Sequence, residues 1–334
     1  MTAVRRYLMI LAALAVLVAL VGCSREITRV ENNDPGPSSC FACHDDNDPF
    51  IVSMEYAWSN SVHASGRVVA RATRSSCAAC HSTEGFIQVA NGEEVTGIDN
   101  PTVIHCFGCH APHSTSDFGL RKDDVTPLQD GTSYDMGPAN LCVNCHQARR
   151  NVNDYVFDGV EMSEHFGPHY GTQTDMLWAS NGYEFDGYEY GDKPFHRTMI
   201  ERGCVGCHYD ASNTYAVGGH SFNMVAIDDE EGEEILNLGA CSGCHDIDDY
   251  DYNDVQTEIA ALEDQLRGLL FDAGLVDDTG HATDGLVVTA DEGGAVFNYL
   301  FVHYDRSHGV HNSDYARDLL QSSIDFLESV PVGK

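Results

Sequence analysis

Three stretches near the C-terminal end of the chain place apolar residues at the spacing of an amphipathic helix. Between residues 255 and 270, apolar side chains recur three and four positions apart, and the run stops before Gly274. A second stretch covers about residues 291–304, and a third covers residues 313–330 and is closed by Pro331. We therefore expect three helices after residue 250.

A single apolar run, residues 7–21, lies at the other end of the chain. Arg5 and Arg6 precede it, and Leu-Val-Gly-Cys at positions 20–23 resembles a bacterial lipobox. The run is shorter than the roughly 20 residues that a helix needs to span a bilayer. We expect residues 1–22 to be removed as a lipoprotein signal peptide, Cys23 to be lipidated, and residues 23–39 to form a tether.

Six Cys-x-x-Cys-His pentapeptides fill the region between these two ends and use twelve of the thirteen cysteines. The motif residues are Cys40, Cys43 and His44; Cys77, Cys80 and His81; Cys106, Cys109 and His110; Cys142, Cys145 and His146; Cys204, Cys207 and His208; and Cys241, Cys244 and His245. Two thiols at this spacing form thioethers with the vinyl groups of one haem, and the adjacent His supplies the proximal iron ligand. Disulfides and zinc sites need no His after every second Cys. The sequence therefore predicts six covalent haems c.

The density of these motifs decides the fold class. All six begin between residues 40 and 241, so we expect the haems to supply the buried apolar bulk in place of a conventional core. We predict a mainly α fold with extensive irregular loops, in which a haem array is covered by the C-terminal helices. Residues 40–334 would form one domain, with a haem-binding region at 40–250 and a helical region at 251–334.

The charge of the chain limits its partners. It carries 52 acidic and 18 basic residues, a net charge of −34, so no basic surface is available to neutralise the phosphates of nucleic acid. Acidic clusters at 45–48, 228–234 and 246–254 favour a solvated surface, and contact with Ca²⁺ or a metal oxide is the alternative.

The second axial ligand of each iron separates an electron carrier from an enzyme. Eleven histidines remain once the six motif histidines are set aside, five more than the irons require. They are His63, His105, His113, His165, His169, His196, His220, His281, His303, His308 and His311. This surplus favours imidazole over methionine, the other possible ligand, for which the candidates are Met136, Met162, Met176, Met199 and Met224.

Several segments around these histidines resemble the multihaem c-type cytochromes of respiratory and extracellular electron transfer. They read WSNSVH at 58–63, CHAPH at 109–113, HFGPHYG at 165–171, FH at 195–196, GGHSF at 218–222 and GVHN at 309–312. The resemblance implies distal ligation by His63, His113, His169, His196, His220 and His311. His105 competes with His113, and His165 with His169, while His281, His303 and His308 are spares. Bis-histidine ligation throughout implies low potentials.

These features favour an electron carrier of the cell envelope. We expect an exported protein, lipid-anchored to the outer membrane on its periplasmic or cell-surface face, that exchanges electrons with other multihaem cytochromes. The alternative is a multihaem reductase with one open haem, because the closing helices and residues 309–312 also resemble the nitrite reductase and octahaem reductase superfamily. No Cys-x-x-Cys-Lys motif occurs, and the surplus of histidines argues against a vacant iron. A third interpretation is a homo-oligomer or filament that stacks haems end to end.

Overall fold

The computed structural model describes residues 49–330 except 116, 192–194 and 229–231. These residues belong to one compact unit. The predicted signal peptide, Cys23, the tether and the first motif with Cys40, Cys43 and His44 lie outside the described residues.

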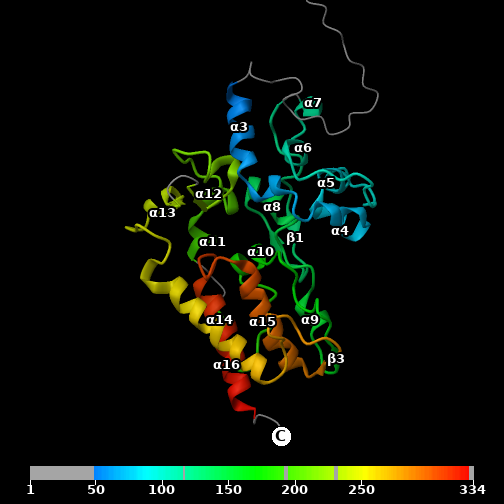
Figure 1. Cartoon of the computed structure of the whole chain (residues 1–334), viewed down its shortest axis with the longest axis vertical. Helices are drawn as coiled ribbons and strands as arrows, with labels where there is room; N and C mark the ends of the chain where they lie inside the picture. The colour runs from blue at the N-terminus through cyan, green and yellow to red at the C-terminus, as the bar shows by residue number, and fades with distance from the viewer. Residues whose placement is uncertain (1–48, 116, 192–194, 229–231, 331–334) are drawn as a thin grey trace, which may run out of the picture. The chain divides into compact units, whose positions relative to one another are not determined.

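Short helices and turns make up most of the described chain before residue 255 (Figure 1). The helices are α3 Pro49–Ser59, α4 Ser75–His81, α5 Thr83–Ala90, α6 Cys106–Cys109, α7 Pro112–Thr115, α8 Asn140–Val143, α9 Val152–Tyr155, α10 Gln173–Trp178, α11 Phe195–Met199, α12 Cys204–His208 and α13 Gly239–Ser242. The 3₁₀ turns are η1 Val62–Ser65, η2 Val69–Thr73, η3 Gly137–Ala139, η4 Gly219–Ser221 and η5 Tyr252–Asp254. Long irregular connections join them, as the fold class predicted.

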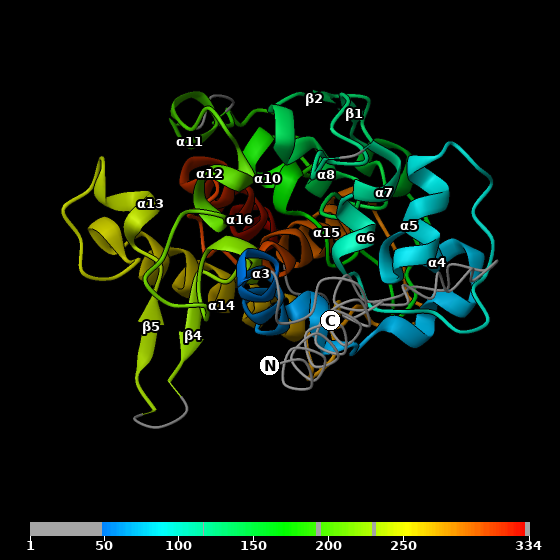
Figure 2. The same cartoon turned by 90° about the horizontal axis from the view of Figure 1, so that it is seen from above.

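Extended structure is limited to three antiparallel pairs of short strands among the described residues. The pairs are β1 Thr126–Pro127 with β2 Ser133–Tyr134, β3 Val160–Glu161 with β6 Val287–Val288, and β4 Val225–Ile227 with β5 Glu234–Leu236. In the longest pair Ala226 faces Ile235. Figure 2 shows β4 and β5 projecting from the helices beside them.

Three long helices end the chain and confirm the elements that the apolar spacing predicted. They are α14 Val255–Asp272, α15 Ala290–Asp305 and α16 Ser313–Ser329. A capping box starts α15, because the Thr289 hydroxyl accepts from the Glu292 N–H at 3.3 Å and the Glu292 carboxylate accepts from the Thr289 N–H at 2.9 Å. Asn312 caps α16 by accepting from the Tyr315 N–H at 3.2 Å.

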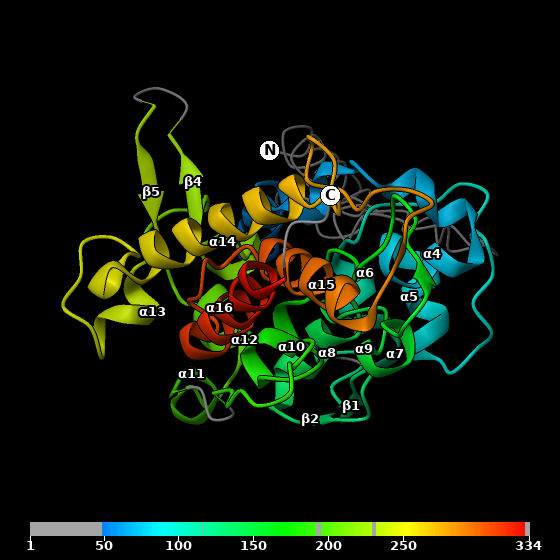
Figure 3. The same ribbon diagram turned by 90° about the horizontal axis from the view of Figure 1, so that it is seen from below.

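These helices build a conventional hydrophobic core, so the expectation that haems would replace one was wrong. Helix α16 packs against both α14 and α15 (Figure 3). Phe297, Phe301, Leu319 and Leu266 are fully buried there, and each such side chain stabilises the fold by about 1.5–3 kcal/mol relative to exposure. Helix α15 is apolar on nearly every side after its first turn, and a helix of that kind is buried all round.

Asn298, a polar residue buried inside α15, is hydrogen-bonded to the backbone of Tyr183. Asn298 accepts from the Tyr183 N–H at 2.8 Å and donates to the Tyr183 carbonyl at 2.8 Å. One turn earlier, a Cβ on Gly294 would lie 2.2 Å from Cδ1 of the Tyr183 ring. The segment that contains Tyr183 is therefore locked against α15 by paired hydrogen bonds and by close approach.

Within the part of the chain that the structure describes, no helix combines the length and the apolar character that a membrane crossing needs.

Candidate haem-binding sites

Each described motif contains a short helical turn that brings its cysteines and histidine together. Backbone hydrogen bonds run from the His110 N–H to the Cys106 carbonyl at 2.8 Å, from His146 to Cys142 at 2.9 Å and from His245 to Cys241 at 2.9 Å. Residues three and four apart in a helical turn lie on the same face. The two thiols and the imidazole of a motif therefore face one side, as attachment of one haem requires.

Cysteines of different motifs also meet. The thiols of Cys80 and Cys145 lie close enough to shift each other's pKa, downward for Cys80 and upward for Cys145, and Cys204 and Cys142 affect each other in the same way. The ten motif cysteines within the described residues form no disulfide. The fourth motif therefore adjoins both the second and the fifth.

Five of the six motif histidines lie in the described chain, and each faces one distant histidine. The ring centres are 6.4 Å apart for His81 and His169, 6.4 Å for His110 and His220, 6.1 Å for His146 and His63, 6.3 Å for His208 and His311, and 6.2 Å for His245 and His196. Each distant partner is a residue nominated as a distal ligand from the sequence. The nomination gave the set but not these pairings.

The spacing of these rings fits a metal ion between them. Metal–imidazole bonds of about 2 Å on either side of one ion separate two ring centres by about 6 Å. Other aromatic contacts of the described residues vary more widely, from 4.2 Å for Tyr170 and Tyr304 to 6.5 Å for Phe301 and Tyr315. What sets the five pairs apart is their composition, because every histidine–histidine ring contact of the described residues joins one motif histidine to one distant histidine.

The surroundings of three of the distant histidines, His63, His169 and His220, favour neutral imidazole, which is the form that binds a metal. Burial lowers the pKa of His63 to about 4, with a further contribution from His146. Burial likewise lowers the pKa of His220 to about 4, with His110 adding to the effect. Burial and then the Arg149 charge lower the pKa of His169 to about 4.

Hydrogen bonds at Nδ1 fix several rings and leave Nε2 for a metal. Three rings donate through Nδ1 to backbone carbonyls: His196 to Val310 at 2.6 Å, His208 to Phe222 at 2.9 Å and His110 to Gly119 at 3.4 Å. Nδ1 of His146 donates to the Gln173 amide oxygen at 3.3 Å. Nδ1 of His220 is hydrogen-bonded to the Tyr209 hydroxyl at 3.3 Å. Nδ1 of His311 donates to the Asp305 carboxylate at 2.6 Å. Burial lowers the pKa of His311, but the charge and hydrogen bond of Asp305 outweigh it and leave that pKa raised.

Phe222 links three of the pairs. Its ring lies 5.6 Å from His63 and 6.1 Å from His220, and its carbonyl accepts from His208. Its φ of 57° is in the left-handed region, which a bulky residue rarely adopts. A strained backbone at this point is held by the surrounding contacts and marks a constrained junction.

Two alternatives left open by the sequence are placed differently by the fold. His165 has a side chain that is 83% exposed, beside Glu164, and His169 is the residue that faces His81. The His169 φ of 72° follows Gly167, whose φ is 123°. The segment is thus a turn, and the helical face that would have made the two histidines equivalent does not exist.

The other alternative concerns the partner of the first motif. Nδ1 of His105 accepts from the Phe107 N–H at 3.3 Å and caps α6, while its Nε2 is buried with no hydrogen-bond partner among the described residues. The His113 ring lies 5.7 Å from Phe107. Neither histidine faces a described motif histidine, and His44 lies outside the described residues.

The remaining candidates have other surroundings. Nδ1 of His303 donates to Glu263 at 2.7 Å on the surface of α15. Of the candidate methionine ligands, Met162 and Met176 are buried in the hydrophobic core, and Met199 is exposed. The partners at Nδ1, above all Asp305 and Phe222, carry no sequence motif, and only the fold brings them to the rings.

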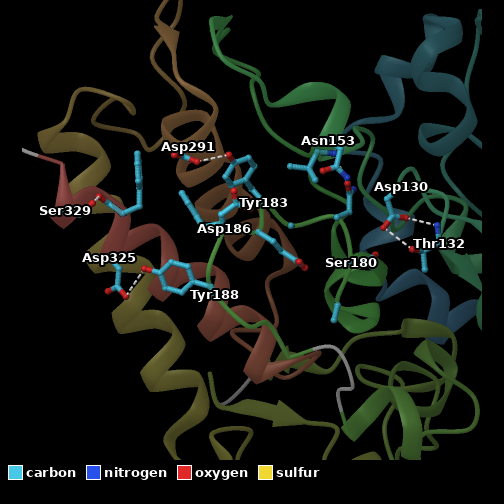
Figure 4. A pocket seen from close by; sticks show the side chains of 17 residues that line it. Asp130, Thr132, Asn153, Ser180, Tyr183, Asp186, Tyr188, Asp291, Asp325 and Ser329 are labelled. Carbon is cyan, nitrogen blue, oxygen red and sulfur yellow. Dashed lines mark hydrogen bonds between the residues drawn. The ribbon is translucent and has the colours of Figure 1, made fainter.

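A cavity of about 800 Å³ lies apart from these pairs, between the 179–188 segment and the helices α15 and α16 (Figure 4). Its lining contains no cysteine or histidine. Tyr183 donates to Asp291 at 2.8 Å and Tyr188 to Asp325 at 3.4 Å. Its polar groups are largely bonded to one another, so the cavity adds nothing to the histidine sites.

No protein-family model matches the chain. The C-type polyheme cytochrome OmcB of Geobacter sulfurreducens is 23% identical over 334 aligned residues, which cover 76% of this chain and 44% of that protein. The C-type polyheme cytochrome OmcC of the same organism is 23% identical over 339 residues, which cover 77% of this chain and 43% of that protein. The chain therefore spans less than half the length of these relatives.

Two solved structures resemble the fold. The outer cell wall cytochrome OcwA superposes with a TM-score of 0.51 and 22% identity, over 81% of this chain and 49% of that one. The undecaheme cytochrome from the S-layer of Carboxydothermus ferrireducens gives a TM-score of 0.45 and 18% identity, over 84% of this chain and 40% of that one. The likeness to OcwA shows a shared fold.

Proposed function

We propose that this chain, which is a multihaem c-type cytochrome, transfers electrons and carries six covalent haems c. The observation that carries the proposal is the set of five histidine pairs at 6.1–6.4 Å. A haem held between two imidazoles changes oxidation state by one electron and leaves no iron position for substrate. The paired histidines therefore suit a carrier better than a catalyst.

Each motif would hold one haem through its two cysteines and its own histidine. The proximal ligands are then His44, His81, His110, His146, His208 and His245, and the distal ligands in the same order are His113, His169, His220, His63, His311 and His196. Ring spacing supports five of these pairs. His113 goes to the first motif because it is the nominee left over. In addition, Nδ1 of His105 accepts from the Phe107 N–H, which places the proton of the neutral ring on Nε2, the atom that would have to bind iron.

The fourth motif would be the junction of the array. Its cysteines contact Cys80 of the second motif and Cys204 of the fifth, and Phe222 joins its distal histidine to that of the third. The sixth site adjoins the fifth, because the carbonyl that accepts from His196 belongs to Val310, the residue before His311. We infer a branched path with the fourth site at its centre.

The lipobox-like segment at residues 20–23 and the charge of the chain support a location on the cell envelope. We propose that Cys23 is lipidated and holds the protein at the outer membrane, on its periplasmic or cell-surface face. OcwA is by its name a cytochrome of the outer cell wall, which is consistent with an exported relative. A net charge of −34 favours redox partners, such as other multihaem cytochromes, that present a complementary surface.

The test is replacement of a distal ligand in the exported, haem-loaded protein. His220→Met should move one step of a potentiometric titration to higher potential, since methionine ligation raises haem potentials. His165→Met is the matched control, because His165 is exposed and faces no motif histidine; it should leave every step unchanged. Mass spectrometry should show six haems and an acylated Cys23.

Two outcomes would contradict the proposal. A titration of the His220→Met protein that matches the wild type would remove this residue from the ligand set. Rapid binding of carbon monoxide or cyanide to a high-spin haem of the wild type would reveal an open iron and favour the multihaem reductase.

A further inference from the structure

Asp305, the last residue of α15, holds a buried carboxylate against one of the paired imidazoles. Its side chain is 1% exposed, and Oδ1 accepts from Nδ1 of His311 at 2.6 Å. The other oxygen, Oδ2, accepts from the Ser307 hydroxyl, and the Ser307 Oγ in turn accepts from the His311 N–H at 3.1 Å. The carboxylate and the imidazole are thus fixed by a closed set of hydrogen bonds.

This placement is unfavourable for a carboxylate unless positive charge lies close by. Asp305 ends a helix, where the backbone dipole repels an anion. No lysine or arginine lies within ion-pair distance of it among the described residues. A buried carboxylate without a cationic partner is strongly destabilising. The missing positive charge would come from the site that His311 and His208 enclose, whose oxidised form carries one charge more than its reduced form.

Where another paired histidine donates at Nδ1, its acceptor is weaker. His196 and His208, the latter being the partner of His311, donate to backbone carbonyls, and His146 donates to an amide oxygen. Among the paired histidines of the described residues, only His311 bonds a carboxylate. A carboxylate at Nδ1 makes the ligand more basic than a neutral acceptor does, and the charge-assisted bond is the stronger one.

We propose that Asp305 is a positioning residue that gives the His208–His311 site the lowest potential of the five described sites. The inference rests on the proposed function, because it takes these two histidines as the ligands of one haem. The carboxylate favours the oxidised form in two ways, by its charge and by strengthening the imidazole as a donor. The site is therefore the last to be reduced and passes an electron on to the fourth or sixth site.

The experiment compares substitutions in the full haem-loaded protein by spectroelectrochemical titration at one fixed pH. Asp305→Asn keeps an acceptor at Oδ1 and removes the charge, and it should raise the lowest-potential step by a tenfold change in its equilibrium constant, about 59 mV for one electron. Ser307→Ala removes the hydroxyl that donates to the Asp305 carboxylate, so Asp305 becomes a stronger acceptor for His311 than it is in the wild type. It should move the same step to lower potential, and this opposite sign tests the inference independently of any loss of stability.

The matched control is Glu263→Gln. It removes a carboxylate from Nδ1 of His303 at 2.7 Å, the same kind of bond on a histidine that faces no motif histidine, and it should move no step. His311→Met separates the two levels of the argument, because it should raise one step whatever Asp305 does. If His311→Met moves a step and Asp305→Asn moves none, or moves one that is not the lowest, the inference is overturned. If His311→Met moves none, the ligand pair itself is wrong.

Discussion

Asp175 offers a pH-dependence that can be worked out from the fold. It lies on α10 and is fully buried, where it accepts from the Ala148 N–H at 2.7 Å and from the Asn181 amide at 3.1 Å. Burial nonetheless raises the pKa of Asp175 from 3.8 to about 7, because the two hydrogen bonds do not replace the lost solvation of the charged form.

The direction in which stability changes with pH depends on whether the folded or the unfolded state holds the Asp175 proton. The folded protein keeps Asp175 protonated up to about pH 7, whereas the unfolded chain releases that proton near pH 3.8. Its contribution to stability is fully present below the lower value and is lost as the pH rises through the upper one. About three pKa units correspond to about 4 kcal/mol in all, of which about 2–3 kcal/mol falls between pH 5 and pH 8.

Asp175→Asn removes this titration, so its free energy of unfolding should fall less than that of the wild type between pH 5 and pH 8, by about 2–3 kcal/mol. Urea unfolding followed by far-UV circular dichroism at both pH values measures the difference. Asp325→Asn, which removes an exposed carboxylate from α16, is the control for net charge. The absolute stability of the Asn variant is not the test, because an amide cannot accept both hydrogen bonds. Parallel pH curves for wild type and Asp175→Asn would refute the reasoning.

Two further predictions concern the hydrophobic core and the His81–His169 site of the second motif. Gly294→Ala should lower the free energy of unfolding by about 1–3 kcal/mol, because the new Cβ would lie 2.2 Å from the Tyr183 ring. Gly268→Ala, on α14 with open space around its Cβ, should instead raise the free energy of unfolding by about 1 kcal/mol. Chemical unfolding of both variants measures the two changes, and changes of the same sign would contradict the packing. Arg149 lies 3.6 Å from the Cys80 sulfur, and its charge helps to lower the pKa values of His81 and His169. The positive charge of Arg149 disfavours the oxidised form of the His81–His169 site, so Arg149→Gln should lower the potential of that site by up to about 60 mV, and by less at high salt. The control Arg317→Gln, on the α14–α16 surface, should change no potential. A rise in potential in Arg149→Gln would contradict the reasoning.

The features that the sequence predicts well are local ones. Each Cys-x-x-Cys-His motif is complete within five residues, and the helices α14, α15 and α16 follow from spacing over three or four turns. The pairing of histidines could not be obtained in this way. His63 faces His146, and His208 faces His311, across chain separations that no periodicity encodes. A family resemblance indicates which histidines are distal ligands but does not assign each of them to a motif.

The hydrophobic core shows a different kind of failure. The motif density suggested that no conventional core could form, since small loop-rich domains need other sources of stability. That argument averaged over a chain whose apolar residues are unevenly spread. The part of α15 after Glu292 is almost free of charge until Asp305, which by itself indicates a helix buried on all sides. The core draws most of its residues from the region of the three C-terminal helices and the rest from the segment between the fourth and fifth motifs.

The corner between α15 and α16 ties these two parts together. His311 lies in this corner, Val310 accepts from His196 there, and the carbonyls of Tyr304 and Asp305 accept from the Gln173 amide at 2.8 and 3.4 Å. The same Gln173 side chain accepts from His146. Three of the five described histidine pairs are therefore held by residues of this corner, while the pairs of His81 and His110 have no such contact among the hydrogen bonds of the described residues. The helices do more than cover the sites, because the rigidity of their core fixes the rings at the fourth, fifth and sixth motifs, and under the proposed function this ligand geometry would set the potentials there.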